Sequence, residues 1–281
     1  MIRIALAQQD FPVGDMTGNL ARAQKRIVSA RDEGADLILF PEMTISGYPP
    51  EDLLLRPGFK RRCPDVMDEL VASVEGRDVV SGHPWTEGVD RFNAVSWVRV
   101  GVVLGRYFKQ VLPNYAVFAE RRYFSAGTQP LVIEVQGHRV GVIICEDAWV
   151  TGPASSAKKA GAELLLVPNA SPYLDNKLAA RLENLSERSK ECGLPMVYGN
   201  LVGGQDELVF DGRSILMNAY GGFSTRDNSC EEGLPIACYA SESGNLWFEG
   251  YEDQTNLDGA VVLQGENTIA CIYAVLVRGL R

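Results

Sequence analysis

Apolar runs and helix-like patterns alternate along the first 220 residues and predict an α/β protein. Residues 2–8 (IRIALAQ) and 36–40 (DLILF) have the length and composition of strands. The segment 20–33 between them has apolar residues at helical spacing, and Gly34 follows it as a helix stop. The pattern therefore predicts a strand–helix–strand unit whose second strand ends at Phe40.

The same pattern returns in the middle of the chain. The phrase GADLILFPE, which starts at Gly34, is similar to GAELLLVPN, which starts at Gly161. Self-similarity of this kind indicates two related helix-to-strand units, and chance similarity of two such transitions is the alternative. If the repeat is real, Glu42 and Asn169 hold related positions at the ends of two strands of one compact domain.

Further elements are predicted on both sides of this repeat. We expect strands at 78–83, 94–107, 140–144, 196–200 and 215–218, a hairpin at 202–214, and helices at 154–160, 177–192 and 272–281. The segment LLLRP at 53–57 is expected on a loop, with a short core helix as the alternative. Beyond Gly221 the pattern fades, and only loop with short strands can be assigned.

The run RVGVIICEDAW at 139–149 carries the first candidate chemistry. A strand of this composition is buried on both faces, so its end is a rigid edge at which a side chain can be aimed. Cys145 stands at that edge, and the acids Glu146 and Asp147 after it disfavour a thiolate unless a cation and a base lie near. A buried cysteine that acts as a small apolar residue is the alternative.

Composition and charge exclude several classes of function. The chain has 281 residues, 46% hydrophobic and 22% charged, as in an ordinary globular protein. Its net charge of -9 and pI near 4.9 argue against nucleic acid or an anionic membrane as a partner. No apolar run is long enough for a membrane helix, and we expect a cytoplasmic protein. Six cysteines without CxxC spacing disfavour a zinc site or a disulfide framework.

Several common catalytic motifs are absent from the sequence, and their absence limits which residue could act as the base for Cys145. Only His83 and His138 could serve a Cys–His or Ser–His arrangement, and HExxH, GxGxxG, GxxxxGK[ST] and GxSxG segments do not occur. Glu42 and Lys109, each at the end of a predicted strand, are the remaining partners for Cys145. Each of them alone would be an ordinary solvated side chain.

These residues carry a resemblance to a known superfamily. FPE at 40–42, YFKQVLPNY at 107–115 and CEDAW at 145–149 resemble, in this order, the signature segments of the nitrilase or carbon-nitrogen hydrolase superfamily. More narrowly, SGYPPEDLLLRP at 46–57, LPNYAVFAERRYFSAG at 112–127 and VGGQDELVFDGRS at 202–214 are similar to the glutamine-hydrolysing domains of the glutamine-dependent NAD synthetase family. The resemblance covers about residues 2 to 220.

The resemblance implies a fold and a division of the chain. The fold is a four-layer α-β-β-α sandwich. Residues 1–270 are expected to form the glutamine amidotransferase domain, and 271–281 to begin the linker or helix that leads to an ATP-dependent synthetase domain. A Ser-Gly-Gly-x-Asp-Ser loop, which that second domain uses, does not occur in this sequence.

The resemblance also implies residue roles. Glu42 is the general base, Cys145 the nucleophile, and Lys109 a donor to the oxyanion of the tetrahedral intermediate, together with a backbone N–H near Glu146 or Asp147. The residues that hold the glutamine substrate are Tyr115, Ser171 and Lys177, and those that line the same pocket are Tyr48, Glu146 and Trp149. Glu146 is further expected to orient Lys109. For Ser171 an ordinary turn, and for Trp149 core packing, are the alternatives.

Partners and cofactors follow from the same resemblance. The expected substrate is L-glutamine, no cofactor is expected in this chain, and ATP with Mg²⁺ is expected only in the synthetase domain, where ammonia amidates deamido-NAD. A homo-oligomer is expected. Two alternatives stay open: a stand-alone amidase or carbamoylase of the same superfamily, and a non-catalytic interaction module of that fold.

Overall fold

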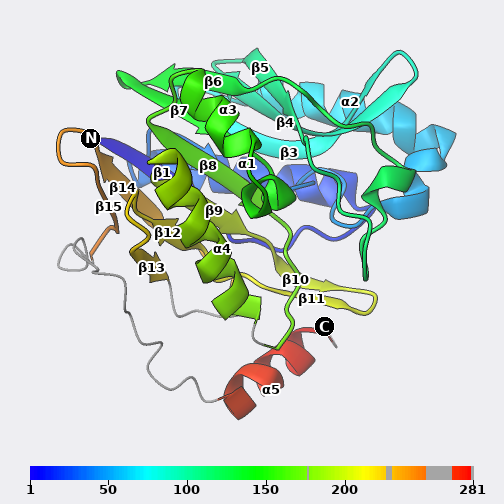
Figure 1. Cartoon of the computed structure of the whole chain (residues 1–281). Coiled ribbons are helices and arrows are strands. Elements are labelled where there is room, and N and C mark those ends of the chain that lie inside the picture. Colours follow the sequence, from blue (N-terminus) through cyan, green and yellow to red (C-terminus); the bar gives the residue numbers. More distant parts are fainter. Residues whose placement is uncertain (176, 226–229, 251–267, 280–281) are drawn as a thin grey trace.

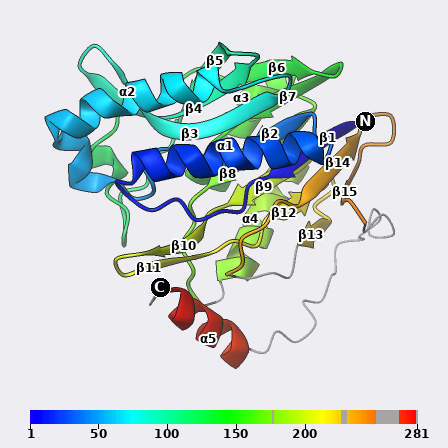
Figure 2. The same ribbon diagram turned by 180° about the vertical axis from the view of Figure 1, so that it is seen from behind.

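Two β-sheets lie face to face, and helices cover the outer face of each (Figures 1 and 2). The computed structural model describes residues 1–175, 177–225, 230–250 and 268–279. Helices α1 (Met16–Asp32) and α2 (Pro57–Ala72) cover one sheet, and α3 (Pro153–Lys159) and α4 (Lys177–Cys192) cover the other. The predicted four-layer α-β-β-α sandwich is confirmed.

The first sheet has seven strands in the order β15-β14-β1-β2-β3-β4-β5. The strands are β1 (Ile2–Leu6), β2 (Leu37–Leu39), β3 (Asp78–Glu87), β4 (Asp90–Arg99), β5 (Val102–Phe108), β14 (Ile236–Ala240) and β15 (Asn245–Phe248). β1, β2 and β3 run parallel, and the other neighbours are antiparallel. The prediction of one strand over 94–107 was wrong, because Val100 and Gly101 turn the chain with positive φ angles of 45° and 71° between β4 and β5.

The second sheet has six strands in the order β13-β12-β9-β8-β7-β6. They are β6 (Leu131–Val135), β7 (His138–Val142), β8 (Leu164–Asn169), β9 (Met196–Asn200), β12 (Ile215–Met217) and β13 (Phe223–Thr225). The predicted hairpin over 202–214 is present as β10 (Val202–Gln205) and β11 (Leu208–Asp211). Among the described residues beyond Gly221, β13 joins this sheet, and β14 and β15 join the first.

Several helices differ from the sequence prediction. The pattern did not reveal α2, because Pro57, Gly58 and Pro64 hide the helical period. Pro57 stands in the first turn, where proline is well tolerated, and Pro64 lies inside the helix. The segment 53–57 lies in the 3₁₀ helix Glu51–Leu55 and the start of α2, with Leu54 buried and Leu55 58% exposed. Helix α5 (Thr268–Gly279) spans the predicted domain boundary at residue 270, which stays a prediction. No helix in the described ranges is long and apolar enough to cross a membrane.

The alternation of side chains along the strands divides the core into two parts. Ile2, Ile4 and Leu6 of β1 are fully buried in the cluster that fills the space between the sheets and continues beneath α3 and α4. Ala5 and Ala7 point the other way and belong to the cluster beneath α1 and α2. Both faces of the central parallel strands are therefore apolar, which is why these strands read as continuous apolar runs in the sequence.

The structure contains the repeated unit that the sequence indicates. The β1–α1–β2 segment and the β7–α3–β8 segment each form a parallel strand pair. The backbone N–H of Arg3 donates to the Asp36 carboxylate at 2.9 Å, and that of Arg139 donates to the Glu163 carboxylate at 3.2 Å, so the two units share the same tie between their strands. One unit lies in each of the two facing sheets, and the residues after β2 and β8 meet between the layers, where the N–H of Ala170 donates to Glu42.

Gly82 of β3 offers a test of how closely the loop after β2 is packed. A Cβ atom at Gly82 would lie 2.5 Å from the backbone nitrogen of Met43 and 2.6 Å from the carbonyl oxygen of Pro41. We expect Gly82→Ala to lower the free energy of unfolding by about 2 kcal/mol, because neither backbone atom can move without the loop. Urea unfolding measures this. Gly58→Ala, whose Cβ would meet nothing within 4 Å, is the matched control. Equal stability of the two variants would contradict the packing.

Candidate active site

The three residues with candidate chemistry stand just after three different strands. Glu42 follows β2, Lys109 follows β5, and Cys145 begins the 3₁₀ helix Cys145–Trp149 that follows β7. β2 and β5 belong to the first sheet and β7 to the second. Face-to-face packing of the sheets is therefore what brings the Glu–Lys–Cys cluster (Glu42, Lys109 and Cys145) together.

A buried ammonium group lies at the centre of this cluster. The Lys109 Nζ atom is 2.8 Å from Glu42 Oε1 and 2.8 Å from Glu120 Oε1. Glu42 and Lys109 are each 1% exposed and Glu120 is 5% exposed. Two carboxylates thus share one cation in a space without bulk water, where an unpaired charge would be very unfavourable.

Glu42 is held by both sheets. Its Oε1 atom accepts hydrogen bonds from Lys109 and from the Asn93 side chain at 2.6 Å, and its Oε2 atom accepts one from the backbone N–H of Ala170 at 3.1 Å. Ala170 directly follows β8, the strand that corresponds to β2 in the repeated unit. The residue after β8 in one copy of the repeat thus helps to position the Glu42 carboxylate, which follows β2 in the other copy.

Burial and charge pull the pKa values of this cluster in opposite directions. Burial alone disfavours the ammonium, but the carboxylates of Glu120 and Glu42 outweigh it and hold the Lys109 pKa well above its usual range. For Glu120, burial dominates and raises its pKa to about 7, although Lys109 acts against that rise. Lys109 therefore stays charged, and one carboxylate beside it can exchange a proton near neutral pH.

Cys145 lies at a sharp turn between strand and helix. Its φ angle is +45°, a left-handed conformation that non-glycine residues rarely adopt, and the residue is 6% exposed. Burial raises the pKa of the thiol well above its usual range, Glu42 adds to the rise, and Lys109 acts against it. The thiol is therefore protonated at rest, and it needs a base to become a nucleophile.

Two pairs of polar and aromatic side chains surround this turn. The Tyr115 hydroxyl donates to the Glu146 carboxylate at 2.9 and 3.0 Å. The Lys177 Nζ atom lies 4.4 Å from the centre of the Trp149 ring, in cation–π contact. Burial lowers the Lys177 pKa, Arg181 contributes to that fall, and the nearby Cys145 and Glu146 act against it. An ammonium, a carboxylate and a tyrosine thus lie around the nucleophile candidate.

Ser171 is positioned by a buried network behind these pairs. Its backbone N–H donates to Asn200 Oδ1 at 2.9 Å, and its hydroxyl accepts from Arg181 Nε at 3.2 Å. Arg181 is 1% exposed and pairs with Asp211 at 2.9 Å, on the hairpin strand β11. The serine is therefore more firmly held than a simple turn residue requires.

A family model described as carbon-nitrogen hydrolase matches residues 3–244. The chain belongs to the carbon-nitrogen hydrolase family. A glutamine-dependent NAD(+) synthetase from Xanthomonas campestris pv. campestris is 50% identical over 223 residues, which are 78% of this chain and 40% of that relative. The predicted resemblance is thereby confirmed.

Solved structures agree with this assignment. The glutamine-dependent NAD+ synthetase from Acinetobacter baumannii, in complex with ADP, matches with a TM-score of 0.89 and 36% identity over 99% of this chain and 51% of that one. An amidase of the nitrilase superfamily from Nesterenkonia matches with a TM-score of 0.74 and 26% identity over 84% of this chain and 89% of the amidase. The chain thus spans about half the length of its synthetase relatives or less.

One predicted contact in this family member differs from expectation. Glu146 was expected to orient Lys109, but its carboxylate bonds Tyr115, and the Lys109 ammonium is held by Glu42 and Glu120 instead. Tyr48 was expected to line the glutamine pocket, and this stays a prediction. The structure shows that it is 4% exposed and that its hydroxyl donates to Glu120 Oε1 at 2.9 Å.

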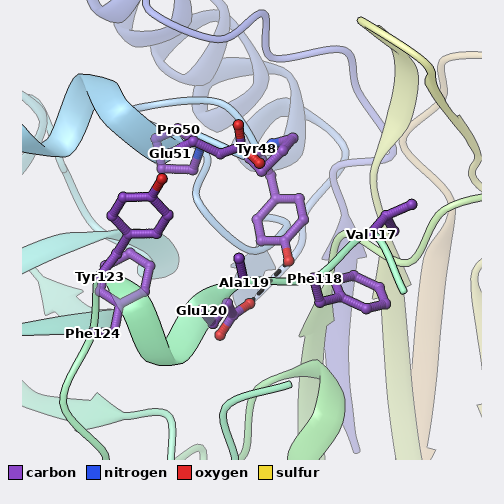
Figure 3. A pocket seen from close by; sticks show the side chains of 10 residues that line it. Tyr48, Pro50, Glu51, Val117, Phe118, Ala119, Glu120, Tyr123 and Phe124 are labelled. Atoms are coloured by element: carbon purple, nitrogen blue, oxygen red, sulfur yellow. Dashed lines mark hydrogen bonds between the residues drawn. The ribbon is translucent and has the colours of Figure 1, made fainter. Parts of the chain in front are cut away.

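Tyr48 and Glu120 border a small pocket beside the Glu–Lys–Cys cluster. Figure 3 shows the two side chains pointing toward one another between the loop after β2 and the segment around Phe118. The other walls are largely apolar and include Phe118, Tyr123 and Phe124. Among the described residues, no group of three or more His, Cys, Asp or Glu side chains is placed to hold a metal ion.

Sequence reasoning missed Glu120, Asn93 and Arg181. Glu120 lies inside the quoted segment LPNYAVFAERRYFSAG, so an acid in that segment was a usable signal. Asn93 and Arg181 carried no such signal, because an isolated asparagine in a strand or arginine in a helix is ordinary in sequence. Their contacts depend on packing across long sequence separations.

Removal of the buried ammonium should make stability depend strongly on pH. In Lys109→Met the carboxylates of Glu42 and Glu120 face each other without a cation, and we expect a loss of about 4 kcal/mol at pH 8. Lys109 acts against the raised pKa of Glu120, which is about 7 in the unsubstituted protein, so its removal raises that pKa further and the native state binds a proton that the unfolded state lacks. Stability should therefore rise as the pH falls from 8 toward the ordinary glutamate value.

Urea unfolding at pH 5.5 and pH 8 measures this effect. The exposed Lys25 of α1 supplies the control Lys25→Met, which should unfold like the unsubstituted protein at both pH values. A Lys109→Met protein as stable as the control at pH 8 would contradict the charge pairing.

Proposed function

We propose that this carbon-nitrogen hydrolase hydrolyses L-glutamine to glutamate and ammonia through a cysteine thioester. The observation that carries the proposal is the buried Lys109 ammonium between two carboxylates beside the Cys145 thiol. The names of the synthetase relatives, which are glutamine-dependent, support glutamine as the amide.

Acylation begins when Cys145 Sγ attacks the carbon of the substrate side-chain amide. The Glu42 carboxylate takes the thiol proton as the S–C bond forms, and the amide oxygen becomes an oxyanion. The intermediate collapses when the C–N bond breaks and Glu42 returns the proton to the leaving nitrogen. Ammonia departs, and a thioester on Cys145 remains. Glu42 is suited to both transfers because its two oxygens are fixed from both sheets.

Lys109 is the electrostatic partner of this step. Its high pKa excludes a role as nucleophile, since a charged ammonium has no lone pair to offer. It can offset the oxyanion charge, and one such donor is typically worth about 3 kcal/mol of barrier, roughly a hundredfold in rate. Of the two backbone N–H groups expected to assist, that of Asp147 already donates to Ile144 O at 3.0 Å. The N–H of Glu146 is therefore the proposed second donor.

Deacylation repeats the chemistry with water in place of the thiol. Glu42 takes a proton from water, the resulting hydroxyl attacks the thioester carbon, and the S–C bond breaks as glutamate leaves. The thiol of Cys145 regains its proton from Glu42. One carboxylate thus serves both halves of the reaction, and the cluster returns to its starting protonation state.

The two pairs around the turn supply recognition of an α-amino acid. The Lys177 ammonium can bind the substrate α-carboxylate, and the Glu146 carboxylate, held by Tyr115, can bind the α-ammonium. Ser171 is fixed by Arg181 and adds a hydrogen-bonding group. Trp149 shields Lys177 from water on one side. Tyr48 donates to Glu120 and is proposed to line the same pocket.

The proposed consumer of the ammonia is a synthetase domain. The synthetase relatives are about twice the length of this chain or more, and the matched region carries the hydrolase fold. ATP and Mg²⁺ would be required only in the further domain, where ammonia amidates deamido-NAD. A cytoplasmic location and a homo-oligomeric assembly belong to the same proposal.

A stand-alone amidase is the second candidate function. The Nesterenkonia amidase matches over 89% of its own length, so this fold is sufficient for an amidase without a further domain. Acetamide, propionamide, asparagine and glutamine would separate the candidates by ammonia release. A kcat/KM for glutamine at least about a hundredfold above that for propionamide fits the α-amino acid site, because two ion pairs then distinguish the substrates.

We predict that Cys145→Ala abolishes glutamine hydrolysis and leaves the melting temperature within a few degrees. The thiol is small, and its role is covalent. Ammonia release and thermal unfolding measure the two effects. Cys63→Ala, at a cysteine that is also buried but lies in α2, is the matched control and should keep full kcat. Ammonia release by the Cys145 variant would exclude the thioester mechanism.

We predict that Glu42→Gln blocks both acylation and thioester hydrolysis, because a neutral amide cannot accept either proton. Mass spectrometry of the protein mixed with glutamine shows whether a thioester accumulates. Fast accumulation followed by slow hydrolysis would assign the first proton transfer to another group.

A further inference from the structure

We propose that Asp147 is a positioning residue that fixes the Cys145 turn against the strand end that carries Lys109. The proposal rests on the glutaminase function above. The hydrogen bonds of the Asp147 carboxylate go to neighbours of Lys109 and Cys145, and the proposed mechanism does not otherwise use this carboxylate.

The Asp147 carboxylate is fully buried and accepts four hydrogen bonds. Its Oδ2 atom accepts from the Tyr107 hydroxyl at 2.8 Å and from the backbone N–H of Ile144 at 3.0 Å. Its Oδ1 atom accepts from the backbone N–H groups of Gln110 at 3.1 Å and Val111 at 2.8 Å. Three of the partners are backbone N–H groups that can only donate, and an ionised carboxylate accepts from all four together.

These donors flank the two residues whose separation matters for the reaction. Tyr107, Gln110 and Val111 lie on both sides of Lys109, and Ile144 directly precedes Cys145. The first group belongs to β5 and its continuation in one sheet, and Ile144 follows β7 in the other. One carboxylate therefore ties the two segments across the layers.

The strain at the nucleophile explains why such a tie is needed. Cys145 keeps a φ angle of +45°, which the surrounding structure must enforce, because a non-glycine residue relaxes from that region when it is free to do so. The Asp147 bond to the N–H of Ile144 holds the residue before the strained position. A shift of this turn would move the thiol relative to Lys109 and Glu42 without removing any reacting group.

The charge state of Asp147 agrees with this role at neutral pH. Burial raises its pKa to about 6, and the bonds from Ile144 and Tyr107, together with Lys109, act against a larger rise. The carboxylate is therefore ionised at pH 7.5. In Asp147→Asn the side chain keeps its size, but its NH₂ group must face backbone N–H donors and cannot accept from them. The side chain therefore loses its hydrogen bond to Ile144 or its hydrogen bonds to Gln110 and Val111.

Asp78 offers a matched control for a merely structural effect. It is also a buried aspartate, 4% exposed, and accepts from Trp97 Nε1 at 2.7 Å and from Arg99 at 2.7 Å. These bonds tie β3 to β4 within one sheet and do not involve the Glu–Lys–Cys cluster. Asp78→Asn therefore tests what the loss of a buried carboxylate does to stability alone.

The experiment compares Asp147→Asn, Asp78→Asn and Tyr107→Phe at pH 7.5. The readouts are kcat and KM for glutamine, the melting temperature, and the rate at which iodoacetamide alkylates Cys145, followed by peptide mass spectrometry. We expect Asp147→Asn to lower kcat about a hundredfold and the alkylation rate at least about tenfold, with KM within about threefold, because misplacement acts on the reacting atoms. Tyr107→Phe should show a smaller loss in the same readouts, since one of four bonds is removed.

The control should lose melting temperature and keep kcat within about twofold. An equal loss of kcat in Asp78→Asn and Asp147→Asn, or a change in KM alone, would overturn the proposal. If Asp147→Asn does not fold, Tyr107→Phe decides: lower kcat and slower alkylation at an unchanged melting temperature support the tie, and unsubstituted values of both overturn it. If the unsubstituted protein releases no ammonia from glutamine, the glutaminase proposal fails, and the alkylation rates of the variants still test the role of Asp147.

Discussion

The arrangement of this protein depends on one buried cation shared by two carboxylates. Lys109 lies between Glu42 and Glu120, and each of the three side chains is at most 5% exposed. Charges at such a depth persist only when every one is paired and hydrogen-bonded, because desolvation otherwise exceeds the Coulomb attraction. The surrounding layers supply this. The N–H of Ala170 donates to Glu42 Oε2, Asn93 donates to both carboxylates, and Tyr48 adds a second hydrogen bond to Glu120 Oε1. Burial and the Glu42 carboxylate raise the pKa of the Cys145 thiol, so the cysteine rests as a thiol beside this carboxylate.

The repeated strand–helix–strand unit explains how this pairing is built from distant parts of the chain. In α/β units the carboxyl ends of parallel strands form an edge at which side chains can be presented. Here two such units face each other, so the end of β2 carries Glu42 and the end of β8 supplies the N–H that holds it. The strand β5 adds Lys109 from the side, and β7 ends at the strained Cys145. Precision at the site therefore comes from sheet packing rather than from one local loop.

Polar groups buried around the site divide into two connected sets. Asp147 joins the turn at Cys145 to the segment around Lys109, and Arg181 with Asp211 joins Ser171 to the β10–β11 hairpin. Both sets consist of ionised side chains that receive or donate several hydrogen bonds in a dry environment, where such bonds are strong and directional. Helix α5 packs against the same hairpin. The β10–β11 hairpin therefore contacts the Arg181 network behind Ser171 and also helix α5.

The sequence by itself determined the elements whose pattern is local and strong. The apolar runs of β1, β2, β8 and β9, the period of α4 and the repeated phrase at Gly34 and Gly161 were readable without contacts, and so were the strand-end positions of Glu42, Lys109 and Cys145. Only the tertiary structure decided which ends meet. Helix α2 was hidden by its prolines, and the hairpin of β4 and β5 by a turn at Val100. Glu120 meets Tyr48, and Asp147 meets Val111, through packing across dozens of residues. Periodicity reports the burial of a face, whereas the partner of a buried charge depends on how the sheets stack.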